Sequence, residues 1–181
     1  MSESIEKLLN DTPTSELVEN YWDAIEHVMK MIRASEVKAG LILSFYGIVL
    51  GLVFERITTM GEIGTIQPFI YVIITAWAYT VVASIYFSFK CFMPRIEGNY
   101  EKNVFFFGDA ISAFGDINEY SQKLLEVTLN SRELYKQLGH QIYINSKIAG
   151  IKFKNVNRSI RYLAISFMIL IFLAFFYVIT K

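Results

Sequence analysis

The sequence is poor in the side chains that most often carry chemistry. It has one cysteine, Cys91, and two histidines among 181 residues. One thiol cannot form an internal disulfide, and so few Cys and His residues exclude the usual zinc spacings, so we expect no metal site. No HExxH motif, nucleophile elbow or Gly-Lys-Ser/Thr phosphate loop occurs, so we expect no catalytic residues and no enzyme. Lysine plus arginine equals aspartate plus glutamate at 17 each, which does not favour a nucleic-acid partner.

Charge is also scarce, whereas apolar side chains are abundant. Charged residues make up 19% of the chain and hydrophobic residues 54%. No charge interrupts residues 64–89 or residues 162–180. A helix needs about 20 mostly apolar residues to cross the hydrocarbon core of a bilayer. These two stretches therefore predict two membrane spans.

A third uncharged stretch lies between Lys38 and Glu55 and is shorter. Its small residues recur at i, i+4, i+7 and i+11, which places them on one face of a helix. Small residues at this spacing let helices approach closely in lipid, where packing drives association. We therefore predict a span with a helix-packing face made of Gly40, Ser44, Gly47 and Gly51.

Lysine and arginine are unevenly distributed between the loops. The segment between the second and third spans carries many of them, whereas the loop after the first span has one Arg against two Glu. Positive loops stay in the cytoplasm. We predict an all-α membrane protein with three transmembrane helices and long cytosolic helical extensions, its N-terminus inside and its C-terminus outside. The expected parts are a cytosolic helix (1–37), three spans (38–56, 64–90 and 161–180) and, between the last two spans, a cytosolic loop with a long coiled-coil-like helix (91–160).

Two long helices are expected in the cytosolic part. An apolar stripe follows Thr12-Pro13, and no Gly or Pro interrupts residues 14–39, so one helix should run from the cytosol into the first span. From Ile117 to Ile148, seam positions alternate three and four apart, which predicts a second long helix leading into the last span. This seam is polar at Ser131, Gln141 and Asn145. Such positions either select register and oligomeric state or contact a ligand.

Positive charge also gathers where the spans meet the cytosol. The positive-inside bias and attraction to lipid headgroups account for such a set. An anion site is the alternative. In it Arg95 would donate two parallel hydrogen bonds to a phosphate, polar side chains would hydrogen-bond to the edge of a base, and Tyr120 or Tyr143 would stack on the base. A small nucleotide suits that set. The candidate ligand-binding residues are Lys38, Arg95, Tyr120, Gln141, Asn145, Ser146, Lys147 and Lys152.

Several short motifs occur in a recognisable order. They are "EVKAGLILSFYGIVLGL" at the first span, "MPRI" after the second, "NVFFFGDAI", and "QIYINSKIAGIKFKNV" before the last span. In this order the sequence resembles the membrane effectors of bacterial Pycsar antiphage systems, from about Ser35 to the C-terminus. One departure is Glu36, where the family pattern has an aspartate. The motif-bearing positions are Lys38, Pro94, Arg95, Gln141, Ser146, Lys147 and Lys152.

The resemblance implies a function that spacing alone does not show. A partner cyclase makes cyclic CMP or cyclic UMP, and the effector binds it, needs no cofactor and impairs the bacterial inner membrane, which causes abortive infection. Three spans are too few to enclose a wide aqueous path, so we expect a homo-oligomer. Charged residues stand only at the ends of the spans and none lies deeper, which favours disruption over a selective channel. The alternatives are a membrane scaffold that recruits a protein through its cytosolic helix and an ungated, holin-like lysis protein.

Overall fold

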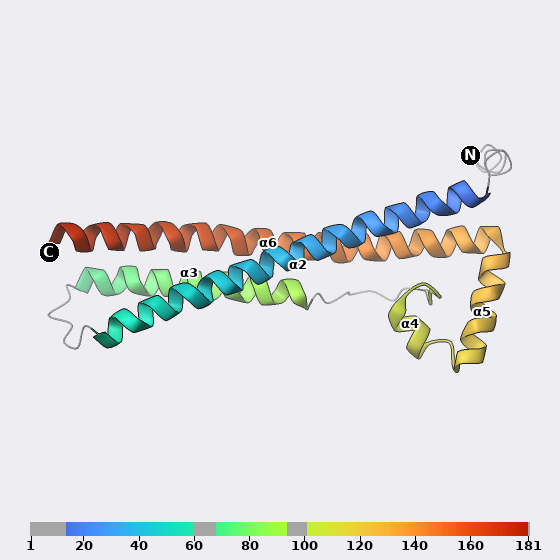
Figure 1. Ribbon diagram of the computed structural model, residues 1–181, viewed down its shortest axis with the longest axis horizontal. Coiled ribbons are helices and arrows are strands. Elements are labelled where there is room, and N and C mark those ends of the chain that lie inside the picture. Colours follow the sequence, from blue (N-terminus) through green and yellow to red (C-terminus); the bar gives the residue numbers. More distant parts are fainter. Residues whose placement is uncertain (1–13, 60–67, 94–100, 181) are drawn as a thin grey trace. The chain divides into compact units, whose positions relative to one another are not determined.

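Helices dominate the part of the chain that the structure describes. The computed structural model describes residues 14–59, 68–93 and 101–180. Within these ranges there are five helices and no strand (Figure 1). Three of them are long and apolar enough to cross a membrane, which confirms the predicted all-α class with three spans. The helices are α2 (Thr14–Thr59), α3 (Pro68–Phe92), α4 (Phe107–Ser112), α5 (Ile117–Leu129) and α6 (Ser131–Thr180).

Two of the helices continue without a break from a polar stretch into an apolar one. α2 is a single helix of 46 residues, as the uninterrupted pattern predicts. α6 is a single helix of 50 residues that ends in the last uncharged stretch. The predicted start of the first helix at Thr12-Pro13 lies outside the described residues.

The predicted continuous helix from Ile117 is wrong, because it is broken at Asn130. The backbone of Asn130 is extended, with φ −101° and ψ 97°, and ends α5. Its side-chain oxygen accepts a hydrogen bond from the backbone N–H of Glu133 at 3.2 Å. Asparagine satisfies the first amides of a helix in this way and so competes with helix continuation. The coiled-coil-like segment is therefore two helices, α5 and α6, and only the α6 part leads into the span.

The described chain forms two compact units. Unit 1 contains residues 14–31 and 101–149, and unit 2 contains residues 32–59, 68–93 and 150–180. α2 and α6 each contribute to both units. Each unit has its own cluster of buried apolar side chains.

Unit 2 is a bundle of three helices with a thin core. Ala39, Ile42 and Tyr46 of α2 pack with Trp77 and other residues of α3 and α6. The same helices expose many large apolar side chains, among them Leu41 (66%) and Phe69 (63%). A protein in water rarely exposes so much contiguous apolar surface. Lipid is the solvent that this surface fits.

Hydroxyl groups bind α3 to α6 inside unit 2. Ser159 Oγ is 3.0 Å from Ser84 Oγ and 2.7 Å from Ser88 Oγ, and the Ser84 hydroxyl also donates to the Ser159 carbonyl at 2.8 Å. Tyr46 OH of α2 lies 2.9 Å from Ser166 Oγ of α6. All five side chains are buried. Side-chain hydrogen bonds of this kind stabilise helix pairs in membranes by about 0.6 to 2 kcal/mol each.

Most of the small-residue face of α2 is not covered by the residues that the structure describes. A Cβ placed on Gly47 or Gly51 meets no described atom within 4 Å, and one on Gly40 meets only the Phe92 ring at 3.9 Å. Ser44 is exposed. The reason is that α2 turns Ala39, Ile42 and Tyr46 inward, and these lie about 140° around the helix from the small residues. Packing of this face against another chain stays a prediction.

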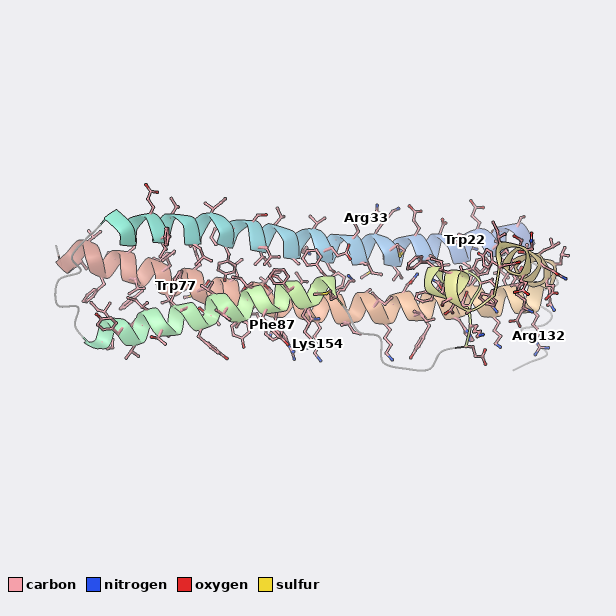
Figure 2. All side chains as sticks on the ribbon, turned by 90° about the horizontal axis from the view of Figure 1, so that it is seen from below. Trp22, Arg33, Trp77, Phe87, Arg132 and Lys154 are labelled. Carbon is pink, nitrogen blue, oxygen red and sulfur yellow. The ribbon has the colours of Figure 1, made fainter. Side chains whose placement is uncertain are left out.

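Unit 1 is held by apolar and aromatic contacts between α2 and α6. Its buried cluster consists of Ile25, Leu134 and Leu138, and Phe105 packs against it. The Trp22 ring meets the Phe105 ring edge to face, with centroids 5.7 Å apart; Figure 2 labels Trp22 on α2. In the run of three phenylalanines from Phe105, whose apolar character favours a packed core, Phe105 is packed in this way, whereas Phe107 is 76% exposed.

Candidate functional site

A loop, residues 101–106, is attached to α6 by two amide side chains. The Asn103 side-chain N–H donates to the Gln137 carbonyl at 2.7 Å. The Val104 backbone N–H donates to Gln137 Oε1 at 2.9 Å. Asn103 Oδ1 accepts from the Phe105 N–H, and Gln137 Nε2 donates to Glu133 Oε1 at 3.0 Å. Every amide atom of Asn103 and Gln137 is thus occupied, so we assign this pair a structural role.

A second amide pair, one helical turn further along α6, is incompletely bonded. Gln141 is 8% exposed and Asn145 is 4% exposed. Gln141 Nε2 donates to Asn145 Oδ1 at 3.3 Å, the long end of the usual range. Gln141 Oε1 is buried and has no hydrogen-bond partner among the described residues. Leaving such an acceptor unpaired costs about 1–3 kcal/mol, so its retention requires an explanation.

The other predicted residues of α6 do not gather around this pair. Tyr143 is 61% exposed, and Ser146 and Lys147 are exposed. At 100° per residue, Tyr143 and Lys147 project from the side of α6 opposite Gln141. The structure therefore places Gln141 and Asn145 in contact with each other, and Tyr143 and Lys147 on another side of α6.

Tyr120 of α5 is already engaged in unit 1. Its hydroxyl donates to the Val104 carbonyl at 3.1 Å, and its ring lies 6.2 Å from that of Phe114. A capping box formed by Asp116 and Glu119 fixes the start of α5. Tyr120 thus supports the segment that Gln137 holds, and stacking on a ligand stays a prediction for it.

The remaining predicted cations belong to unit 2 or lie outside the described residues. Lys38 is exposed, with its Nζ 6.0 Å from the Phe153 ring centroid. Arg95 lies outside the described residues. Lys152 is buried, and its Nζ lies 2.6 Å from Glu36 Oε1 and donates to the Cys91 carbonyl at 3.0 Å. An anion could reach Lys152 only by replacing these partners.

An exposed ion pair lies at the start of the 101–106 loop. Lys136 Nζ of α6 is 2.9 Å from Glu101 Oε2, and His140 Nδ1 is 4.0 Å from the same oxygen. The hydrogen bond from Lys136 holds the pKa of the Glu101 carboxyl below its ordinary value. Because both groups are well exposed, water and salt screen their interaction.

Comparison with known proteins identifies the family. The sequence profile described as Pycsar effector protein domain matches residues 20–179. The chain belongs to the Pycsar effector family. A curated member, Pycsar effector protein PtPycTM of Propioniciclava tarda, is 29% identical over 143 residues, which cover 77% of this chain and 69% of the relative. No solved structure matches the chain.

Family membership defines the broad role of this Pycsar effector. It is a membrane protein of antiphage defence and acts as an effector. Its family is linked to a cyclic pyrimidine nucleotide signal that a partner cyclase supplies. Gln141 and Asn145 are the candidate residues for receiving this signal.

Three important residues of this Pycsar effector are not found by sequence reasoning. Asn103 opens the "NVFFFGDAI" motif, yet its partner Gln137 is 34 positions away. Glu36 is noticed only as a departure from the family pattern, although it pairs with Lys152 across 116 positions. The sequence signal for Asn103 is its place as the first residue of this motif.

Proposed function

We propose that this Pycsar effector binds cyclic CMP or cyclic UMP in unit 1 and then, as a homo-oligomer, impairs the integrity of the bacterial inner membrane. The single observation that supports the binding step is the unpaired acceptor of Gln141. It is a buried amide in a unit whose other buried glutamine, Gln137, is fully bonded.

The chemistry of a pyrimidine edge fits this acceptor. Cytosine presents an amino group next to ring acceptors, and uracil presents a ring N–H between two carbonyls. Gln141 Oε1 can accept from either donor, while the Gln141 and Asn145 amide N–H groups can donate to a neighbouring acceptor. A base bound here would complete the hydrogen bonds that the empty pair lacks.

The continuity of α6 supports a route from the proposed site to the bilayer. Gln141 and the residues of the last span belong to the same unbroken helix. A ligand that turns or tilts the polar half of such a helix would displace the apolar half as well. Insertion of a flexible Gly-Ser segment after Asn157 should therefore abolish membrane damage and leave nucleotide binding intact.

The direct test is a titration of the detergent-solubilised chain with cyclic CMP and cyclic UMP by calorimetry. We expect Gln141→Leu to reduce affinity by about 5- to 150-fold, since a bonded buried amide is worth about 1–3 kcal/mol. Lys123→Gln is the matched control, because Lys123 is an exposed residue of α5 that pairs with Glu126. No binding of either nucleotide by the unaltered chain, or full affinity in Gln141→Leu, would refute the assignment.

Membrane impairment has a separate readout. Cells that make the chain should take up a membrane-impermeant dye only when the cyclic nucleotide is present. Dye uptake without the nucleotide would favour a holin-like protein. Absence of uptake together with stable capture of a protein would favour a scaffold.

A further inference from the structure

One end of unit 2 carries a strong excess of positive charge. The stretches 32–38, 90–93 and 150–161 meet at this end, as the contacts of Lys152 and Asn155 with the last carbonyls of α3 show. Among their described residues the only carboxylate is Glu36, which Lys152 already neutralises. The basic residues are Arg33, Lys38, Lys90, Lys152, Lys154, Arg158 and Arg161.

Aromatic rings organise part of this charge on one side of the bundle. The Phe87 ring of α3 stacks on the Tyr162 ring of α6, with centroids 5.7 Å apart and planes at 6°. The Arg158 guanidinium lies 5.4 Å from the Phe87 centroid, and Lys90 Nζ lies 5.8 Å from the Tyr86 centroid. In Figure 2, Phe87 and Lys154 lie on the same side of unit 2. Stacking holds the guanidinium in place while its N–H groups stay free for an anion.

The depth of these groups agrees with that of phospholipid headgroups. The last uncharged stretch begins at Tyr162, and α6 rises about 1.5 Å per residue. Arg158 therefore lies about 6 Å and Lys154 about 12 Å beyond the edge of the apolar stretch. The headgroup region on each side of a bilayer is about 5–8 Å thick, so the backbone of Arg158 lies within it and that of Lys154 lies just outside it. A long lysine side chain can extend from there back to the headgroups. Tyrosine at this level is typical of the membrane interface.

The geometry points to a phosphodiester-binding site between α3 and α6 whose ligand is the headgroup of an anionic phospholipid. It is formed by Arg158 over the Phe87 ring, Lys90 beside the Tyr86 ring, and Lys154 one turn before Arg158 on α6. Arginine offers two parallel N–H groups to a phosphate, and the two lysines add point charge. Basic sites between membrane helices commonly hold anionic lipids. The positive-inside bias accounts for the sign of this end, whereas it does not account for a guanidinium held on a ring stack. The site is separate from Gln141 and does not depend on nucleotide binding.

The test uses the full chain purified in neutral detergent. We expect phosphatidylglycerol to raise its melting temperature more than phosphatidylcholine does. Each cation removed, as in Lys90→Gln, Lys154→Gln or Arg158→Gln, should weaken phosphatidylglycerol binding about fivefold, because a basic residue near an anionic surface contributes about 1 kcal/mol. Lys123→Gln should have no effect, since Lys123 belongs to α5 of unit 1.

One more variant, a second method and a second ligand complete the test. Arg158→Lys keeps the positive charge and loses the two parallel N–H groups, so it should retain more lipid binding than Arg158→Gln. Native mass spectrometry, which counts retained lipid molecules, replaces melting for any variant that unfolds in detergent. Equal effects of the two lipids, or unchanged phosphatidylglycerol binding in all three variants, would overturn the site. If cyclic CMP in lipid-free micelles gives an Arg158-dependent shift, the site takes a free phosphodiester and the lipid assignment is wrong.

Discussion

Replacement by leucine should destabilise the chain at Gln137 but not at Gln141, although the two glutamines lie one turn apart on α6. Gln137→Leu leaves the buried Val104 N–H without its acceptor at 2.9 Å and releases the segment that contains Asn103. One buried unsatisfied group costs about 1–3 kcal/mol. For a chain of this length that corresponds to a fall of roughly 2–12 °C in melting temperature. The amide of Val104 should also exchange its hydrogen faster.

Gln141→Leu should leave stability nearly unchanged. It removes the unpaired acceptor Gln141 Oε1, which is favourable. It also removes the Gln141 N–H group that donates to Asn145 Oδ1 at 3.3 Å, which is unfavourable, so the two effects offset each other to within about 1 kcal/mol. Melting in detergent and hydrogen exchange of residues 103–105 measure both variants side by side. If Gln141→Leu destabilises the chain as much as Gln137→Leu does, Gln141 has a structural role and the contrast between the two amides is refuted.

Three further predictions concern polar contacts in the two units. Lys152→Met should lower stability by about 1–3 kcal/mol because it leaves the Glu36 carboxylate without its partner, and the added change Glu36→Leu should restore more than half of that loss on melting. Ser159→Ala should cost roughly 0.5–1.5 kcal/mol, since it removes hydroxyl contacts between α3 and α6; an unchanged melting temperature in detergent and in nanodiscs would contradict it. The lowered pKa of Glu101 means that its ion pair with Lys136 stabilises unit 1 at neutral pH, and that this stabilisation is lost as the pH falls through that pKa. In Glu101→Gln the melting temperature should therefore fall less steeply as the pH is lowered.

The sequence predicts the spans well because they depend on a local property. Uncharged runs of sufficient length must be helical in lipid, where no water can satisfy the backbone. The long α2 helix is predictable for a similar reason, since nothing between residues 14 and 39 interrupts it. These features need no knowledge of partners elsewhere in the chain.

Features that depend on distant or competing contacts are harder to predict. The break at Asn130 is missed because the apolar seam continues across it, while one side-chain hydrogen bond to Glu133 decides the local conformation. The inward face of α2 is missed because sequence spacing cannot tell whether its glycines or its larger residues meet the other helices. Of the candidate site, the seam polarity predicts Gln141 and Asn145, whereas the Lys152 contact with Glu36 spans 116 positions and has no local signature.

The sole thiol of the chain provides a built-in probe of helix separation. Cys91 has no exposed surface and lies 3.7 Å from the Ser35 carbonyl of α2, at the end of unit 2 where Lys152 also binds. A maleimide reagent can react with it only when α2, α3 and α6 move apart. The labelling rate of the unmodified protein therefore reports opening of the bundle directly, without any engineered cysteine.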